Sequence, residues 1–391
     1  MIQNIKMPQI RLILLSNYTR VGRLKNSLPT KPSVGSLILL MLLVVALSTC
    51  DAASGTNAAA GSAVATTAPN TGPNDHMETT VLSLPTLDPV LLDGRPLRVI
   101  ATTSLIGDVV SQVGGDAVTQ TTLMGPGQDP HSYQPAAADL TAVAQADVVF
   151  VNGWDLEEGL LDDLATIGEG VPLVPISAGI QPLAFGANAR EHEEENHEGE
   201  AEQSEEDHDH GGADPHVWQS VPNVMRWAEN AAAVLSALDP ANEALYQANA
   251  QAYLAELEAL DAYTREQVAT IPAEERVLVT NHEAFAYLAD AYGFEVLGTI
   301  IPGVSTLAEA TAADLSALIQ AMQAEGVCAL FTETTVSDRL AQTVAAELEG
   351  CDNVQIVKLY TGALGEAGSG ADSYTGMMRA NVAALVAALG Q

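Results

Sequence analysis

The sequence predicts an α/β protein in which two α/β units are separated by one long helix. Short apolar runs alternate with helical segments in two separate stretches, which is typical of βαβ units with parallel sheets. Between these stretches about 30 residues run without a helix breaker, which gives a helix of roughly 45 Å at 1.5 Å per residue. Such a helix could be a rigid strut between the units; the alternative is an ordinary surface helix of one domain.

The first unit, residues 97–238, alternates strands with helices and contains an acidic loop at residues 187–213. Ser104 is placed to cap the first helix, and Gly114-Gly115 is expected to end it. The expected strands are 97–102, 118–124, 147–152 and 173–176, and the expected helices are 105–113, 136–145, 156–164 and 222–238.

The linking helix is expected over residues 239–272, with Asp239 as its N-cap and Pro240 at its first position. The second unit, residues 273–391, repeats the alternation without a visible sequence repeat. Its expected strands are 277–280, 294–300, 327–332 and 354–359, and its expected helices are 283–292, 312–324, 336–348 and 374–389.

The N-terminus has the features of an export signal. Residues 1–33 are basic and contain no acid, and an apolar run at 34–47 has the length of a signal-peptide core. Leu47-Ser48-Thr49-Cys50 resembles the lipobox of bacterial lipoproteins, in which the cysteine is acylated. We therefore expect a signal peptide at 1–49 and a lipid-anchored flexible linker at 50–96; the alternative is an uncleaved membrane anchor.

The chain of 391 residues is strongly acidic, with 50 Asp and Glu against 15 Lys and Arg. This composition argues against nucleic acid as a partner, because nucleic-acid binding needs basic patches. The three cysteines are Cys50, Cys328 and Cys351, and because no CxxC pair exists, a thiolate zinc site is not expected.

An acidic, histidine-containing tract occupies residues 191–210 and holds 11 of the 50 acids. It has no apolar periodicity and is expected to be a solvated loop. Imidazole suits zinc, copper, nickel and iron, so the tract indicates a secondary collector of transition metal; the alternative is an inert charged linker. Its histidines are His192, His197, His208 and His210.

Three further histidines, His131, His216 and His282, lie in segments expected to be ordered. His131 is in a loop after a strand, and His282 directly follows another strand. Ligands of open α/β sheets bind outside the carboxyl ends of the strands, so one histidine from each unit could close on one ion in a cleft. A single histidine would more simply be a hydrogen-bonded structural residue.

From about Leu97 to its end, the chain resembles the metal-binding substrate-binding proteins of bacterial ABC transporters, the zinc and manganese uptake family with its lipoprotein "adhesin" relatives. The acidic histidine loop is that family's zinc-type feature. The motifs that carry the resemblance are GQDPHSYQP at 127–135, DPHVW at 214–218, NHEAFAY at 281–287 and ADSY at 371–374.

The resemblance implies two (β/α)4 lobes joined by one long helix, with the metal in the cleft between them. It implies His131, His216 and His282 as ligands. Gly362 stands where the family often has an aspartate, so the fourth ligand is expected to be water, Glu333 or a loop histidine. Three imidazoles without that aspartate favour zinc over manganese.

The resemblance also implies a monomer, held by its lipid anchor at the outer face of the cytoplasmic membrane, that serves a permease and its ATPase subunit. A manganese- or iron-specific binding protein is one alternative. A secreted zinc-dependent hydrolase is another, although the sequence has no HExxH motif and Glu283 is expected to point away from its neighbour. The adhesin reading has no adhesive motif behind it.

Cys328 and Cys351 are expected to form a structural disulfide. Cys328 lies near the start of a strand, and Cys351 follows the next helix. That helix runs back antiparallel to the strand, so both thiols should lie at the end of the second unit opposite the cleft. The compartment outside the membrane permits oxidation; the alternative is two buried apolar cysteines.

Overall fold

A computed structural model describes residues 80–168, 170–184 and 212–390, all within one compact unit, Asn70–Gln391. The expected signal peptide, Cys50 and the first part of the linker lie outside the described residues, as do the four histidines of the acidic loop. In the described parts, no helix combines the length and the apolar character needed to cross a membrane.

The described residues form two four-stranded parallel sheets, which confirms the expected α/β fold with two lobes. The strand order is β2-β1-β3-β4 in the N-terminal lobe and β6-β5-β7-β8 in the C-terminal lobe, so the second lobe repeats the first. The strands are β1 (Leu97–Ala101), β2 (Val118–Thr122), β3 (Val148–Val151), β4 (Leu173–Pro175), β5 (Val277–Thr280), β6 (Glu295–Thr299), β7 (Ala329–Glu333) and β8 (Gln355–Leu359).

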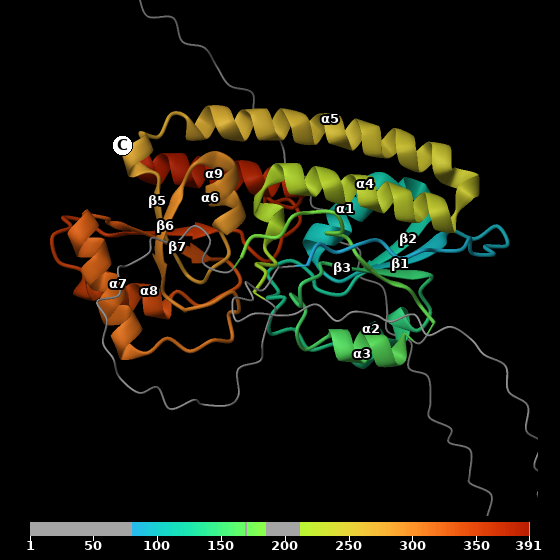
Figure 1. Ribbon diagram of the computed structural model, residues 1–391, viewed down its shortest axis with the longest axis horizontal. Helices are drawn as coiled ribbons and strands as arrows, with labels where there is room; N and C mark the ends of the chain where they lie inside the picture. Colours follow the sequence, from blue (N-terminus) through green and yellow to red (C-terminus); the bar gives the residue numbers. More distant parts are fainter. Residues whose placement is uncertain (1–79, 169, 185–211, 391) are drawn as a thin grey trace, which may run out of the picture. The chain divides into compact units, whose positions relative to one another are not determined.

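Helices cover both faces of each sheet (Figure 1). In the N-terminal lobe α1 and α4 lie on one face and α2 and α3 on the other; α6 and α9, and α7 and α8, do the same in the C-terminal lobe. The helices are α1 (Ser104–Gly114), α2 (Ala137–Val143), α3 (Leu161–Ile167), α4 (Val221–Leu238), α6 (Ala286–Tyr292), α7 (Ala312–Glu325), α8 (Arg339–Glu347) and α9 (Tyr374–Leu389).

The inner strands of each sheet, β1, β3, β5 and β7, are largely apolar on both faces because both faces are covered. In β1, Val99 packs into the main core while Ile100 joins a smaller cluster on the other face. In β5, Leu278 and Val279 divide in the same way between the main core and a cluster under α7 and α8. Successive side chains of a strand point to opposite faces of the sheet. Because both faces are buried here, neighbouring residues are apolar and the sequence shows a continuous apolar run.

Helices α3, α6 and α8 begin several residues later than expected. Helix α3 begins at Leu161, five residues after the expected start, because residues 156–160 form turns and no helix. Gly153, Trp154 and Asp155, which lead into these turns, have positive φ. Helices α6 and α8 each begin three residues late, at Ala286 and Arg339.

The caps of two helices also differ from expectation. Thr103, not Ser104, caps α1 by accepting a hydrogen bond from the backbone N–H of Ile106. The Ser104 hydroxyl instead accepts from the N–H of Leu364 in the C-terminal lobe. Asp239 does not cap the long helix: a short 3-10 turn, Pro240–Asn242, intervenes, and the Asp239 carboxylate accepts from the Tyr246 hydroxyl.

The long helix α5 (Glu243–Val268) packs against helices of both lobes. It runs along α4 of the N-terminal lobe and α9 of the C-terminal lobe (Figure 1). Its buried residues recur every three or four positions, as an apolar helical face requires. They are Tyr246, Ala250, Tyr253, Leu257, Leu260, Thr264 and Val268.

Residues 80–96 correct the expected linker, because they are packed along the N-terminal lobe and are named here the N-terminal strap. The N–H of Val90 donates to the carbonyl of Leu238 at 2.8 Å, and the N–H of Gly179 donates to the carbonyl of Leu82 at 2.9 Å. Apolar side chains of the strap, among them Leu84 and Leu87, contact the main core. The sequence predicts a flexible linker here, but these leucines bury part of their apolar side chains against the lobe, which stabilises the packed position.

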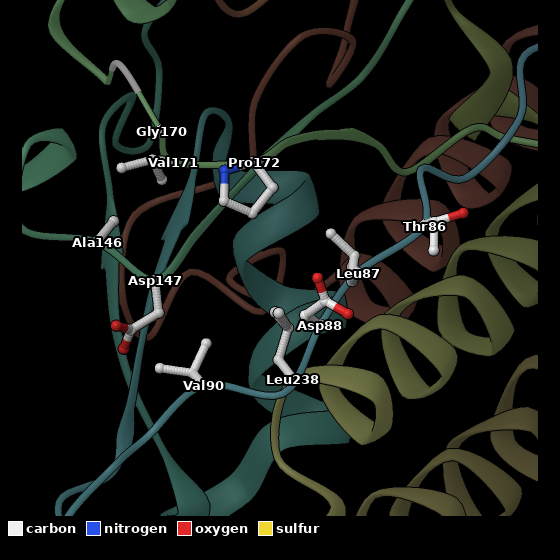
Figure 2. A pocket seen from close by; sticks show the side chains of 10 residues that line it. All are labelled: Thr86, Leu87, Asp88, Val90, Ala146, Asp147, Gly170, Val171, Pro172 and Leu238. Carbon is white, nitrogen blue, oxygen red and sulfur yellow. The ribbon is translucent and has the colours of Figure 1, made fainter.

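A cavity of about 340 Å³ lies between the strap and the amino ends of β3 and β4 (Figure 2). Asp88 and Asp147 line it, and the Asp147 carboxylate is already paired with the Arg95 guanidinium at 2.6 Å. The cavity is thus at the opposite end of the strands from the loop that carries His131, and no candidate ligand lines it.

Cys328 and Cys351 are joined by a disulfide, with their Cα atoms 5.8 Å apart. Cys328 immediately precedes β7, and Cys351 lies between α8 and β8. The bond therefore closes the amino end of β7, whereas Glu333 lies at the carboxyl end of that strand.

Candidate metal centre

His131 lies in the loop between β2 and α2, 4% exposed. Asp129 shapes this loop: one carboxylate oxygen accepts from the His131 N–H at 3.1 Å, and the other accepts from the Ser132 hydroxyl at 3.1 Å. The second oxygen also accepts from the Thr306 hydroxyl of the C-terminal lobe at 2.6 Å. The same aspartate therefore holds the His131 backbone and connects the two lobes.

His216 begins the turn that leads into α4, and it is 2% exposed. Asp214 Oδ1 accepts from both the His216 backbone N–H at 2.9 Å and its ring Nδ1 at 2.8 Å. Two residues later, Trp218 Nε1 donates to the carbonyl of Thr361 in the C-terminal lobe at 2.7 Å. The DPHVW segment thus positions a ligand and packs against the opposite lobe.

His282 lies two residues after the end of β5 and is 2% exposed. The Thr280 hydroxyl donates to its carbonyl oxygen at 2.9 Å. Its ring Nδ1 is bonded to Glu333 Oε1, and the Thr361 hydroxyl donates to Glu333 Oε2 at 2.5 Å. Both Glu333 oxygens are engaged on the outer side of the imidazole, which favours Glu333 as the residue that orients His282 over a role as fourth ligand.

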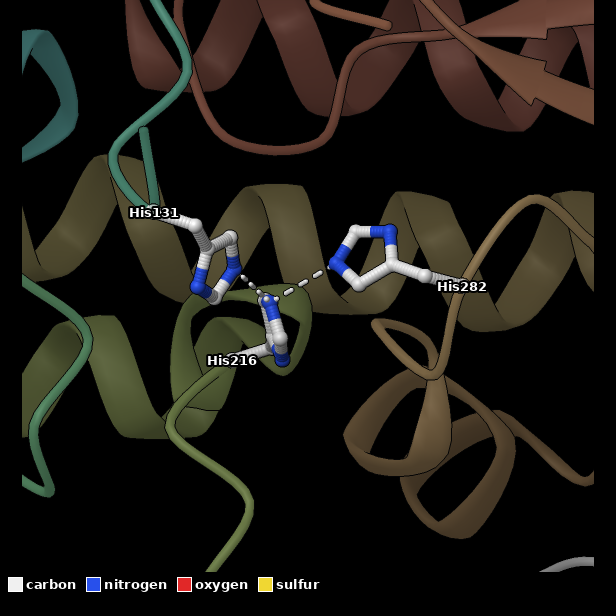
Figure 3. A group of neighbouring side chains, drawn as sticks. All are labelled: His131, His216 and His282. Carbon is white, nitrogen blue, oxygen red and sulfur yellow. Dashed lines mark hydrogen bonds between the residues drawn. The ribbon is translucent and has the colours of Figure 1, made fainter. Parts of the chain in front are cut away.

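The three imidazoles converge on one point through their Nε2 atoms (Figure 3). His216 Nε2 is 3.2 Å from His131 Nε2 and 3.1 Å from His282 Nε2. Nitrogens bound tetrahedrally to one zinc ion, each about 2.05 Å from it, would be about 3.3 Å apart. In the described part of the chain these three residues are the group of potential ligands that could hold one ion.

The protonation of the rings supports a cation at this point. Asp214 and Glu333 accept from Nδ1 of His216 and His282, so the proton of each neutral ring is on Nδ1 and the Nε2 lone pair faces inward. Lone pairs that face one another at about 3 Å repel unless a proton or a metal ion lies between them. The arrangement is therefore suited to a metal that accepts nitrogen donors.

The pKa values of two of these histidines are shifted in opposite directions. Burial, together with the neighbouring His282 and His131, lowers the pKa of His216 well below its usual value. Burial opposes the charge on His282, but the Glu333 carboxylate outweighs it and raises the pKa of His282, while His282 lowers the pKa of Glu333. Burial raises the pKa of Asp214 to about 7, against its hydrogen bond from His216.

Gly362, which follows Thr361, has no side chain to offer the site. A Cβ added at Gly362 would lie 2.7 Å from Cδ of Pro130, next to His131. A carboxylate at this position would require Pro130 to move. The four histidines of the acidic loop lie outside the described residues.

A repeated short motif in the sequence indicates two of the residues that support the site. Asp-Pro-His occurs twice, at 129–131 and 214–216, and in both copies the aspartate accepts from the backbone N–H of the histidine. A short side chain that bonds its own backbone two residues later is a known turn-forming device. The roles of Asp129 and Asp214 could have been inferred from it, whereas those of Glu333 and Thr361 depend on packing between distant segments.

The fold and the site define a two-lobed α/β metal-binding protein whose candidate ligands come from both lobes. Residues 99–388 match the family model described as zinc-uptake complex component A, periplasmic, and the chain belongs to this family.

Relatives of known name are similar over most of the chain. The manganese-binding lipoprotein MntA of Halalkalibacterium halodurans is 34% identical over 299 residues, which cover 76% of this chain and 90% of that protein. The manganese ABC transporter substrate-binding lipoprotein PsaA of Streptococcus anginosus is 31% identical over 297 residues, covering 74% of this chain and 88% of that protein.

Among solved structures, the periplasmic zinc-binding protein TroA of Treponema pallidum matches with a TM-score of 0.65 and 31% identity, covering 76% of this chain and 100% of that chain. The comparisons class the chain with transporter substrate-binding components and not with enzymes, which rules out the hydrolase alternative.

Proposed function

We propose that this protein captures zinc outside the cytoplasmic membrane and delivers it to an ABC-type permease that works with an ATPase subunit. Its ligands in this proposal are His131, His216 and His282. The observation that carries the proposal is the convergence of three buried imidazoles on one point between the lobes. The Nε2 atom of His216 is 3.2 Å from that of His131 and 3.1 Å from that of His282.

Zinc is favoured over manganese by the donor set. Imidazole nitrogen suits zinc, whereas manganese prefers carboxylate and carbonyl oxygen. The carboxylates nearest the site, Asp214 and Glu333, are bonded to the outer nitrogens of the rings. The second candidate is manganese, which the names of MntA and PsaA favour.

The remaining parts of the proposal concern the segments outside the described residues. Acylation of Cys50 would hold the protein at the outer face of the membrane. The protein would act there as a monomer. The acidic loop would act as a weaker secondary collector, because its negative charge raises the local cation concentration at low salt.

Metal content tests the identity of the cargo. Protein purified without added metal should contain zinc, and a competition titration with a chelator should give a much lower Kd for Zn²⁺ than for Mn²⁺. Equal or tighter binding of Mn²⁺ would transfer the proposal to manganese, and no tight binding of either ion would overturn it.

Deletion of residues 191–210 tests the loop separately. The shortened protein should bind fewer zinc ions and capture zinc more slowly at low zinc, while the tight site survives. If tight binding is lost as well, a loop histidine is the fourth ligand.

A further inference from the structure

Each histidine of the site turns Nε2 toward the shared point and Nδ1 away from it, but only two of the three Nδ1 atoms have a bonded carboxylate. His216 has Asp214, and His282 has Glu333. His131 Nδ1 is buried and has no hydrogen-bond partner among the described residues. Glu158 Oε1 lies 3.6 Å from it, which is beyond a normal hydrogen bond.

Asp129 does not serve His131 as Asp214 serves His216, although both belong to an Asp-Pro-His segment. Asp214 Oδ1 accepts from the backbone N–H and from the ring of His216. From His131, Asp129 accepts the backbone N–H but not the ring, and its other oxygen accepts from Ser132 and from Thr306 of the C-terminal lobe. The ring of His131 therefore needs a different acceptor.

Glu158 is placed to be that acceptor. It lies in the loop between β3 and α3, which adjoins the His131 loop: a Cβ at Gly159 would be 3.8 Å from the carbonyl oxygen of Tyr133. The Glu158 side chain is 23% exposed, whereas those of Asp214 and Glu333 are 2% and 1% exposed. Because Glu158 Oε1 is 3.6 Å from His131 Nδ1, a movement of less than about 1 Å would bring it to hydrogen-bond distance.

We propose that Glu158 is the positioning residue of His131: it accepts the Nδ1–H of that ring and directs its Nε2 to the metal. Each ligand histidine then has its own carboxylate, and Glu158 is the most exposed of the three carboxylates. A carboxylate behind a ligand imidazole fixes its tautomer and raises its basicity. This inference rests on the proposed function, because it assumes that His131 binds the metal.

Zinc affinity of three variants measures the effect. Loss of such a partner typically weakens metal binding 10- to 100-fold, and a half-exposed residue should fall at the lower limit. Glu158→Ala should therefore bind Zn²⁺ about tenfold more weakly than wild type. Glu158→Gln keeps an acceptor oxygen without the charge and should lie in between. Asp155→Asn is the matched control, because it removes the same charge from an exposed residue of the same loop and should leave the affinity unchanged.

A second readout separates positioning from a general effect of charge or folding. In the zinc-loaded wild type the His131 Nδ1 proton should exchange slowly with water and give an observable NMR signal. In Glu158→Ala that signal should broaden or vanish, while the signals of His216 and His282 persist.

Unchanged zinc affinity together with an unchanged His131 signal in Glu158→Ala would overturn the inference. An equal loss in Asp155→Asn would also overturn it, since the effect would then be one of net charge. If the wild type itself binds no zinc, the proposed function fails; if the wild type binds zinc and the variants match it, only the role of Glu158 fails.

Discussion

The two lobes share one strand order but are stabilised differently. In the N-terminal sheet, β1 pairs with β2 along its whole length, from Leu97 to Ala101, and the strap packs against the lobe from outside. In the C-terminal sheet, β5 pairs with β7 at Thr280 and Phe331, and its register with β6 shifts after Leu278. A disulfide, not a strap, closes that lobe, so equal topologies can be completed by very different interactions.

The lobes also contribute unequally to the site. The N-terminal lobe supplies His131 and His216 from two Asp-Pro-His segments, each held by its own aspartate. The C-terminal lobe supplies His282 alone, held by Glu333, which also accepts from the Thr361 hydroxyl. A metal ion bound by all three histidines would link the lobes. To separate the ion from the C-terminal lobe, only its bond to His282 would have to break.

Removing that single contact should have the largest effect. Structural zinc sites contribute about 10–16 kcal/mol over four ligands, so His282→Ala should cost about 3 kcal/mol, or roughly 100- to 1,000-fold in zinc Kd. Chelator competition measures it, with His131→Ala and His216→Ala as companions that should lose comparable affinity. Wild-type affinity in His282→Ala would mean that the C-terminal lobe provides no ligand.

Replacing both cysteines should weaken the C-terminal lobe without affecting the site. The disulfide closes a loop with a sequence separation of 23 residues, which the chain-entropy model values at about 3 kcal/mol. The Cys328→Ala/Cys351→Ala protein should unfold at lower denaturant concentration and bind zinc normally, because the bond lies at the amino end of β7. A parallel fall in zinc affinity would show that the two ends of the lobe are coupled.

Changing Glu333 should alter how zinc binding depends on pH. Glu333 raises the pKa of His282, so the metal-free site holds a proton on His282 below that pKa, and zinc must displace it. Zinc affinity should therefore be flat above the raised pKa and fall by up to about tenfold per pH unit below it, because one proton is displaced. Glu333→Gln should bind zinc about 10- to 100-fold more weakly at high pH, with the fall beginning at lower pH. Titrations at several pH values test this, and an unshifted midpoint would contradict it.

Disturbing the contact between the strap and the N-terminal lobe should have the smallest effect on stability. Gly153 has φ +104°, and a Cβ there would lie 2.4 Å from Leu82 Cδ1 of the strap. Gly153→Ala should destabilise the protein by about 1–2 kcal/mol and speed proteolysis or amide exchange within residues 80–96. Gly303→Ala is the matched control, since Gly303 has the same φ of +104° and an added Cβ there would have no heavy atom within 4 Å. If the two variants behave alike, the strap contributes little to the lobe.

Much of the architecture could be predicted from local pattern. The eight strands lie within a few residues of their expected positions, because strands buried on both faces are short apolar runs between turn signals. His131, His216 and His282 could be singled out because each lies in a loop at a strand end or beside a turn motif. The boundaries of α3 and the strap could not, because left-handed residues and scattered leucines have no strong signature.

What the sequence by itself determined is the set of side chains available: an α/β chain, three ordered histidines, and a glycine at position 362. Only the tertiary structure decided what each one does. His282 and Glu333 are 51 residues apart, and His131 and Glu158 come from loops after different strands. Whether a carboxylate binds a metal or orients a ligand depends on distances between such segments. Those distances follow from how sheets and helices pack, because no local propensity encodes them.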